Sequence, residues 1–599
     1  MKKATKLCAL LLTAAMLIGV LGACGGKKKV DTGKFTYWMA FSSQTLSSNS
    51  ERLMYQEMAK ATGTDIEFIH PVSGSTGGEA FQILLSSGKY PDMIEYDWKK
   101  YPGGPDRAIN DHVIISLNDY LKDCAPNYYD YMEGEKGKEN DYLYKMQALS
   151  SEGNYYGFGS LNIGSYRGFS GLIVRKDYLD KWGLDIPTTI DDWTELFKVA
   201  KENGVKYPLT GASTLFSITG SNMFNSAYNV GKYFYVDNGK VKFGPAQKAY
   251  RDYVQQMAEW MKAGYVDPDY ITNDKTSIEA YMTNGTSIAY FGFVGSGIGR
   301  LIPAMEGRDP NFSVIGCPNP VLKEGDAIWT QELQPETNSP FIAITKQCGE
   351  TDAERYKEAI KWCDYLYSED GLILKCFGVE GETFTIEKGE DGQDHYIYTD
   401  KIYDHEKIGA HSVEAALYHF MRPANGPGLN QHPDYLKGFY PYDEQKESIV
   451  TWNQAVESAR KVVLPPLSYT NEEATKIAQI EAAKRDSIDA AVSNVILGKA
   501  KIEDFDKAVE DAMKDGYNEL TKITQTAYDR YISVVSKKLN IQKQKAYTNK
   551  LIKQVYSKTV LYRTATFLIK TEKNHHIFNA KSYLKSDFSD FYKRLLKIF

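Results

Sequence analysis

The stretch Asp92-Met93-Ile94-Glu95-Tyr96 decides the fold class, because it is the third strand predicted in an alternating series. Upstream, aromatic and β-branched residues predict a strand at Phe35-Thr36-Tyr37-Trp38-Met39 and another over 66–68. Helices predicted over about 50–61 and 79–85 separate the three strands, and glycines follow both helices as stop signals. Strand–helix–strand–helix–strand predicts an α/β sheet with parallel neighbours.

The same alternation resumes further along the chain. A second βα unit is predicted at 171–177, and its helix begins near Thr189 with Asp192 at the capping-box position. Asp237-Asn238-Gly239-Lys240 predicts a hairpin turn, because Asn-Gly accepts the positive φ of a type I′ turn. The remaining predictions are a helix over 246–262, strands over 285–292 and 341–344, a helix opened by a capping box at 351–354, and a mainly helical region over 400–531.

Ligands of α/β sheets bind beyond the carboxyl ends of the strands, and aromatic residues follow two of these ends. Trp38 lies at the carboxyl end of the first strand, and Asp97 and Trp98 follow the third. A sugar presents an apolar C–H face and a rim of hydroxyl groups, so a ring beside a carboxylate suits it. We therefore predict that these three residues contact a sugar; the alternative is that the rings pack inside their own lobe.

The N-terminus predicts export and lipid anchoring. Lys2, Lys3 and Lys6 precede an apolar run that is too short for a settled membrane span. The run ends in Leu21-Gly22-Ala23-Cys24, which resembles a lipobox; cleavage would leave Cys24 as the first residue, thioether-linked to diacylglycerol. The alternative is an ordinary secretory signal. We expect a signal peptide at 1–23, a tether at 24–33, and a protein held on the extracytoplasmic face of the cell membrane.

Composition and motifs narrow the function. The chain is 42% hydrophobic and 25% charged with net charge −6, which favours no nucleic-acid partner. It contains 44 Tyr. Such amphipathic rings suit surfaces that hold sugars or peptides, and the alternative is that they fill the core of a large protein. After removal of Cys8 and lipidation of Cys24, five cysteines remain; none has metal-ligand spacing, and a Cys363–Cys376 disulfide stays open.

Catalytic motifs are missing from the sequence: it has no G-x-S-x-G, no H-E-x-x-H and no P-loop. We therefore expect no enzyme, no cofactor and no metal. The Asp391-Gly392-Gln393-Asp394 loop favours a hairpin turn over a calcium site. A glycosidase needs only two suitably spaced carboxylates, so a surface glycoside hydrolase or lyase stays an alternative.

Several short stretches together resemble the large lipoprotein branch of the bacterial extracellular solute-binding proteins (family 1), the capture components of carbohydrate ABC importers. The resemblance covers about residues 1–531. The stretches that carry it are Tyr90-Pro91-Asp92-Met93-Ile94, Tyr101-Pro102-Gly103-Gly104-Pro105, Val174-Arg175-Lys176-Asp177-Tyr178-Leu179, Gly378-Val379-Glu380-Gly381, Leu464-Pro465-Pro466 and Ala527-Tyr528-Asp529-Arg530-Tyr531.

The resemblance implies a two-lobed fold of the periplasmic-binding-protein type, in which strands cross the hinge and the C-terminal part is largely helical. We expect lobe 1 at 34–168 and 338–395, and lobe 2 at 169–337 and 396–531. A monomer would capture a sugar or oligosaccharide between the lobes and release it to membrane permease subunits. A lipoprotein that reports its ligand to a membrane receptor is a second alternative.

Four further residues are candidates for sugar contact. Tyr166 and Arg167 lie where the resemblance places the crossing between lobes, so they could reach the cleft or serve the hinge. Phe293 stands between Gly292 and Val294-Gly295 in a loop that permits close backbone approach, and Trp329 lies in a polar stretch.

The C-terminal tail departs from the pattern. Residues 537–599 carry 15 Lys and Arg against 3 Asp and Glu, a net charge of +12, whereas residues 1–536 have a net charge of −18. We expect an atypical basic tail over 532–599. It is interpreted either as an extension unrelated to the body or as a basic arm for anionic lipid.

Overall fold

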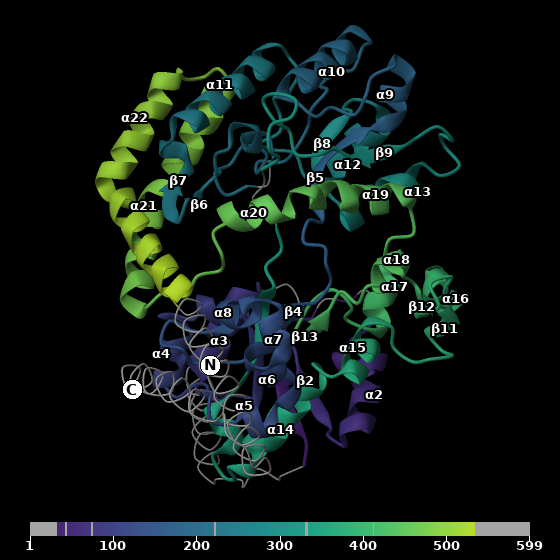
Figure 1. The fold of residues 1–599 in the computed structure, drawn as a ribbon, viewed down its shortest axis with the longest axis vertical. Helices are drawn as coiled ribbons and strands as arrows, with labels where there is room; N and C mark the ends of the chain where they lie inside the picture. The colour runs from purple at the N-terminus through teal and green to yellow at the C-terminus, as the bar shows by residue number, and fades with distance from the viewer. Residues whose placement is uncertain are drawn as a thin grey trace, which may run out of the picture. The chain divides into compact units, whose positions relative to one another are not determined.

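The computed structural model describes residues 33–533, apart from 42, 44, 73–75, 221–222, 330–332 and 411. The chain divides into two units, Met1–Tyr531 and Ile532–Phe599, and only Ile532 and Ser533 of the second unit are described. The predicted signal peptide, Cys24 and most of the predicted tail therefore lie outside the described residues. The first unit contains two α/β lobes (Figure 1).

The first lobe is built on a six-stranded sheet in the order β13-β4-β10-β3-β1-β2. As predicted, β1 is parallel to both β2 and β3, with Phe35 opposite Ile66 and Tyr37 opposite Met93. β10 is antiparallel to β3 and β4, so the sheet is mixed. The strands are β1 (Phe35–Trp38), β2 (Ile66–Ile69), β3 (Met93–Tyr96), β4 (Phe158–Asn162), β10 (Thr337–Ile344) and β13 (Gly428–Asn430).

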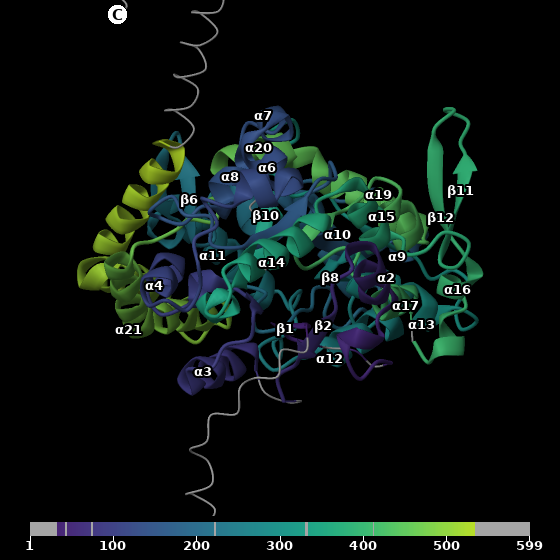
Figure 2. The same ribbon diagram turned by 90° about the horizontal axis from the view of Figure 1, so that it is seen from below.

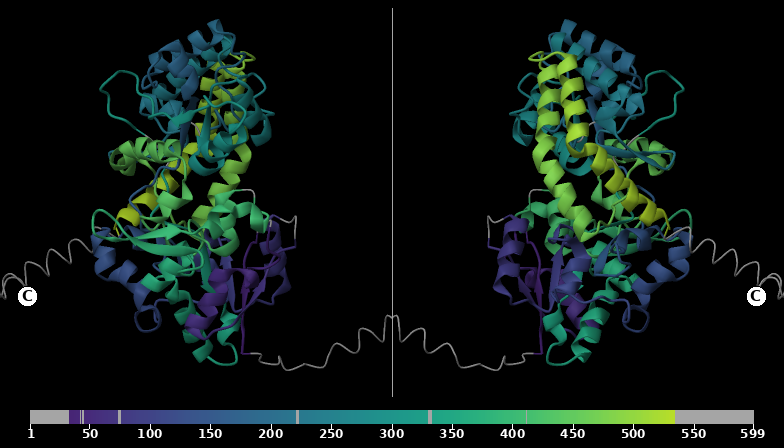
Figure 3. Two further views of the ribbon diagram at one scale, coloured as in Figure 1. Left: turned by 90° about the vertical axis from the view of Figure 1, so that its right-hand side faces the viewer. Right: turned by 90° about the vertical axis from the view of Figure 1, so that its left-hand side faces the viewer.

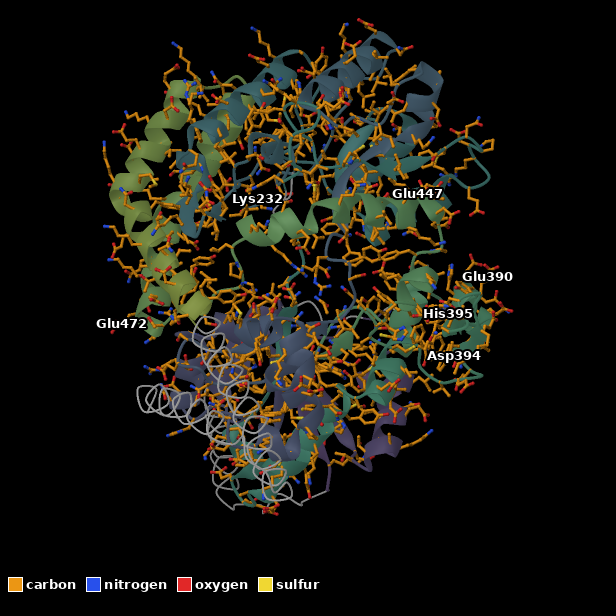
Figure 4. All side chains as sticks on the ribbon, in the orientation of Figure 1. Lys232, Glu390, Asp394, His395, Glu447 and Glu472 are labelled. Atoms are coloured by element: carbon orange, nitrogen blue, oxygen red, sulfur yellow. The ribbon has the colours of Figure 1, made fainter. Side chains whose placement is uncertain are left out.

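Short helices cover this sheet. They are α2 (Leu53–Thr62), α3 (Gly77–Ser87), α4 (Gly104–Asn110), α5 (Leu121–Cys124), α6 (Pro126–Glu133), α7 (Glu135–Glu139), α8 (Leu143–Ala148), α14 (Glu354–Tyr365), α15 (Glu369–Cys376), α16 (Asp400–Tyr403), α17 (Val413–Phe420) and α18 (Tyr435–Phe439). The hairpin of β11 (Phe384–Lys388) and β12 (Asp394–Tyr398) projects from this lobe (Figure 2). Its turn lies at 389–393, as the sequence predicted. His395 lies just after this turn, with its Nδ1 2.8 Å from Asp434 Oδ1 (Figure 4).

The second lobe has a three-stranded sheet, β8-β5-β9, and a hairpin of β6 and β7. Asn238 and Gly239 in that hairpin's turn have φ of 50° and 77°, as the predicted type I′ turn requires. The elements are β5 (Ser170–Arg175), β6 (Phe234–Asp237), β7 (Lys240–Phe243), β8 (Ala289–Phe293), β9 (Val314–Gly316), α9 (Lys176–Trp182), α10 (Ile190–Glu202), α11 (Lys248–Lys262), α12 (Lys275–Asn284), α13 (Gly299–Met305), α19 (Asp443–Trp452), α20 (Val456–Val462), α21 (Asn471–Ile496) and α22 (Ile502–Ala512).

The chain crosses between the lobes several times. It passes from β4 to β5 through 163–169, returns to β10 through 333–336, and leaves α18 for α19 through 440–442. Arg167 holds two of these crossings together: its Nη2 donates to Asn162 O at 2.8 Å, and its Nε lies 3.7 Å from Glu336 Oε1. Since Arg167 is only 4% exposed, it is a buried hinge residue.

A C-terminal strut, residues 463–531, also joins the lobes (Figure 3). Its lower end contacts the first lobe, where Ser468 Oγ donates to Leu149 O at 2.7 Å. There Arg530 Nη2 bonds Glu473 Oε2 at 2.6 Å, just inside α21, and Figure 4 marks the neighbouring Glu472. Further up α21, Ile488 and Val492 are buried in the core of the second lobe. Each end of the strut is thus fixed to a different lobe.

Two expectations need correction, and one alternative that the sequence left open, the Cys363–Cys376 disulfide, is now decided. The assignment of 396–531 to lobe 2 is wrong for its first part, because β13 pairs in parallel with β4 and completes the first-lobe sheet. The capping box predicted at 351–354 does not form: α14 begins at Glu354, and its N-cap residue Ala353 has no side-chain acceptor. Cys363 and Cys376 are free thiols.

Candidate binding site between the lobes

A pocket of about 240 Å³ lies where the lobes meet. The second lobe contributes the end of β8 and the turn after it, and the first lobe contributes α17, α18 and the segment after β13. The thirteen lining residues are Phe169, Phe293, Val294, Gly295, Ser296, Gln334, Glu414, Tyr418, Ala424, Gln431, Tyr435, Phe439 and Tyr440. Aromatic rings and uncharged polar groups therefore dominate its wall.

The second-lobe wall is formed by Phe293 and the π-helical turn η5 (Val294–Ile298). Phe293 ends β8 and keeps 53% of its surface exposed. Gln445 Nε2 donates to Val294 O at 2.9 Å, which fixes the turn against α19. A Cβ on Gly295 would lie 3.4 Å from Glu414 Oε2, so the backbone of this turn approaches the first-lobe wall closely.

The first-lobe wall carries a carboxylate among tyrosines. Glu414 and Tyr418 are four residues apart on α17 and therefore share one face of this helix. Burial, followed by the nearby Glu414 carboxylate, raises the pKa of Tyr418. Burial also raises the pKa of Tyr440, as do Tyr418 and Glu414. Both hydroxyl groups thus stay protonated at neutral pH and can act as donors.

Two carboxamides line the pocket beside the crossing segments. Gln431 Nε2 donates to Gln334 Oε1 at 2.8 Å, and Gln334 N donates to Arg167 O at 2.8 Å. The buried Gln431 Oε1 has no hydrogen-bond partner within the described part of the chain. The Gln431 side chain therefore keeps an unused acceptor atom behind the pocket wall.

A pocket between two hinged lobes is the arrangement that the resemblance predicted. Comparison with known proteins identifies the family to which the chain belongs. Residues 46–373, more than half of the chain, match the family described as bacterial extracellular solute-binding protein. The chain belongs to this family.

Two curated relatives and one solved structure are also similar to this solute-binding protein. Lipoprotein LipO of Bacillus subtilis is 24% identical over 486 residues, which cover 79% of this chain and 88% of LipO. The fructooligosaccharide ABC transporter substrate-binding protein FusA of Streptococcus pneumoniae serotype 4 is 23% identical over 570 residues, covering 87% and 97%. The structure of FusA in complex with kestose has a TM-score of 0.60 at 19% identity, covers 84% and 99%, and supports the two-lobed fold.

Of the seven residues predicted to contact sugar, Phe293 lines the pocket of this solute-binding protein. Trp98 does not: its ring is fully buried, and Nε1 donates to Phe341 O at 3.2 Å. The 3-10 helix η2 (Trp98–Lys100) turns the ring under its own lobe, beside Phe81 and Tyr101. Trp98 is therefore a core residue in this conformation and cannot stack on a ligand.

The other candidates also lie outside the pocket lining. Trp38 is 5% exposed and packs near Phe81. Asp97 accepts a hydrogen bond from Ser339 Oγ at 2.8 Å. Trp329 is 8% exposed and belongs to the core of the second lobe.

Tyr166 and Arg167 belong to the crossing segment. Tyr166 is half-buried, and its carbonyl accepts a hydrogen bond from Arg167 Nη1 at 2.9 Å. Of the two roles considered for Arg167, the geometry supports the hinge.

Sequence reasoning missed the first-lobe wall, because 396–440 was assigned to the wrong lobe. The signal available was the aromatic run Tyr435-Leu436-Lys437-Gly438-Phe439-Tyr440, which is rich in the ring type that composition had singled out. Glu414 gave no signal, since its position in a helical region is that of any solvated carboxylate.

Within the described ranges, no group of three or more His, Cys, Asp or Glu side chains is placed to hold a metal ion. None of the helices described combines the length and apolar character that a membrane span requires.

Proposed function

We propose that this solute-binding protein captures a sugar or oligosaccharide and delivers it to the permease subunits of an ABC importer. The observation that carries the proposal is the inter-lobe pocket, in which aromatic rings alternate with hydroxyl, amide and carboxylate groups. Rings cover the C–H faces of a sugar, and the polar groups bind its hydroxyls. FusA, which matches over most of the chain, is an ABC-transporter protein observed with kestose.

Capture follows from the hinge geometry. The exposed face of Phe293 belongs to the second lobe, whereas Glu414 and Tyr418 belong to the first. A ligand that contacts both walls binds the closed arrangement better than the open one, so binding shifts the population toward closure. The buried Arg167 keeps the crossing segments in register during this movement.

A thermal-shift screen across oligosaccharides, followed by calorimetry, tests the proposal. A ligand at 100 times its Kd adds about 2.7 kcal/mol to the free energy of unfolding, which the screen detects readily. A sugar that stabilises the protein without being cleaved supports capture. Cleavage products in the mixture would favour the hydrolase alternative instead.

We further propose that Cys24 carries a lipid anchor and holds the protein on the extracytoplasmic face of the membrane. The support is the Leu21–Cys24 sequence after a short apolar run, together with the likeness to lipoprotein LipO. Metabolic labelling with a radioactive fatty acid should mark the wild type and not Cys24→Ser. Equal labelling of both proteins would contradict the anchor.

A further inference from the structure

The C-terminal end of α17, the helix that brings Tyr418 to the pocket, is fastened by a buried arginine. α17 ends at Phe420, and the last turn of a helix leaves carbonyl groups without donors from the helix itself. Arg52 Nη1 donates to Tyr418 O and, at 2.8 Å, to Met421 O. A residue that lines the pocket is therefore held through its own carbonyl oxygen.

Arg52 is itself fixed to the sheet of the first lobe. It is the N-cap residue of α2 and is only 4% exposed, and its Nε donates to Asn49 Oδ1 at 2.9 Å. Asn49 is buried as well, and its Nδ2 donates to Met39 Sδ at 3.1 Å, directly after β1. A continuous series of contacts thus connects the end of β1 with the α17 wall of the pocket.

The acceptors of Arg52 are unusual for a buried cation. Among the described residues, its hydrogen bonds go to three neutral oxygen atoms and to no carboxylate. Burial, followed by the nearby Arg422 charge, lowers the pKa of Arg52 to about 10, so the guanidinium stays protonated at neutral pH. The C-terminal end of a helix carries partial negative charge and stabilises a cation beside it. The end of α17 and the Arg52 guanidinium therefore stabilise each other.

The neighbouring arginine has other partners. Nη1 and Nη2 of Arg422 donate to Glu95 at 3.0 and 2.8 Å, and Nη1 also donates to Tyr55 OH at 2.9 Å. These bonds join the chain that follows α17 to β3 and α2. Of the two arginines, Arg52 is the one that bonds the carbonyl groups at the end of the helix.

We propose that Arg52 is a positioning residue for the sugar pocket, which it shapes by holding the Tyr418 and Met421 carbonyl groups; this rests on the proposed function of the site. Arg52 is absent from the pocket lining, so it acts through Tyr418 and does not touch a ligand. Residues that contact a ligand need supporting hydrogen bonds that hold them in the binding geometry. Without the guanidinium, both carbonyl groups lose a donor, and the end of α17 is free to shift.

The first test measures affinity in variants of Arg52. Arg52→Met removes the donors and keeps a long side chain. Calorimetry with the oligosaccharide that stabilises the wild type most in the thermal-shift screen should give a Kd about tenfold higher, the equivalent of about one misplaced contact. Arg52→Lys keeps the charge and a donor, so it should recover part of the affinity and weaken binding only about threefold.

A double-mutant cycle tests the route from Arg52 to the ligand. In a Tyr418→Ala protein, Arg52→Met should weaken binding by at most about threefold further, because the residue through which it acts is gone. In a Phe293→Ala protein, which lacks a ring of the opposite wall, the effect should stay about tenfold. A merely structural role would give the same factor in both backgrounds.

Arg175→Met is the matched control. Arg175 is 3% exposed, and its Nη1 donates to Met282 O at 2.7 Å, but it belongs to the second lobe and lies outside the pocket lining. The melting temperature should fall in both arginine variants, whereas sugar affinity should fall only in Arg52→Met. In the ligand-free proteins, hydrogen–deuterium exchange of α17 amides should be faster in Arg52→Met and unchanged in Arg175→Met.

The outcomes separate the two proposals. Unchanged affinity in a folded Arg52→Met protein, or equal weakening in the Tyr418→Ala and Phe293→Ala backgrounds, would overturn this inference while carbohydrate capture stands. If Arg52→Met does not fold, Arg52→Lys undergoes the same measurements with its smaller expected factor. If no sugar binds the wild type, the proposed function fails, whereas faster α17 exchange in Arg52→Met would still support Arg52 as the residue that positions this wall.

Discussion

Trp98 follows the end of strand β3 and Phe293 is the last residue of strand β8, yet their surroundings differ completely. Trp98 is fully buried, whereas Phe293 is 53% exposed at the pocket. The difference lies in the turn that follows each strand. A 3-10 helix folds Trp98 back beneath its lobe, while a glycine-containing π-helical turn leaves Phe293 directed outward. Strand-end position places a residue near possible ligands, but the next turn decides whether its ring is available.

The largest effect expected from this comparison concerns Trp98→Ala. Removing a fully buried indole should lower the free energy of unfolding by about 3–5 kcal/mol, and it leaves Phe341 O without its donor. Denaturant unfolding monitored by circular dichroism measures the change. If Trp98→Ala leaves the protein stable but abolishes sugar binding, Trp98 is a ligand contact and not a core residue.

Phe293→Ala should act on binding instead. Loss of about 60 Å² of apolar contact with a sugar corresponds to ~1.5 kcal/mol, or about tenfold in Kd. The free energy of unfolding should change by less than about 0.5 kcal/mol, because the ring is half exposed. Ile386→Ala, in the projecting hairpin where Ile386 is 42% exposed, is the matched control and should leave calorimetric affinity unaltered.

Tyr101→Phe tests a polar group at the edge of the ring cluster formed by Trp98, Phe81 and Tyr101. The Tyr101 hydroxyl donates to Asp111 Oδ2 at 3.1 Å. Losing this bond should cost about 1 kcal/mol in the free energy of unfolding, with no effect on sugar affinity. Denaturant unfolding measures the change in stability, and calorimetry measures the sugar affinity. An altered affinity would show that the rings around Trp98 are coupled to the pocket.

Gly295→Ala should have the smallest effect. The added Cβ meets Glu414 Oε2 at 3.4 Å and Tyr440 Cε1 at 3.6 Å, which is ordinary contact. We expect unchanged stability and an affinity about two- to threefold lower as the pocket narrows. A large fall in melting temperature would mean that the turn itself, rather than the space beside it, requires glycine.

Local sequence signals predicted local structure well. Hydrophobic patterning located β1, β2 and β3, and the capping box of Thr189 and Asp192 forms as expected at the start of α10. The alternation of these elements also predicted the α/β class. These features depend on interactions between residues that are close together in the sequence, so they can be predicted from the sequence alone.

The binding wall depends on distant neighbours and was harder to predict. β13 has three residues, and its place beside β4 is determined by a pairing across more than 260 positions. Misplacing β13 moved Glu414 and Tyr418 to the wrong lobe. Trp98 was misjudged for a related reason, since its acceptor, Phe341 O, belongs to a strand 243 residues away.

The position of β4 within its sheet has a consequence for biosynthesis. β4 is complete at Asn162, but its ladder partners β10 and β13 end at Ile344 and Asn430. On a ribosome, both edges of this strand stay unpaired while all three strands of the second-lobe sheet are made. Exposed strand edges invite non-native pairing, and long-range pairing is slow. A nascent chain of this protein therefore depends on whatever shields residues 158–162 until the downstream strands emerge.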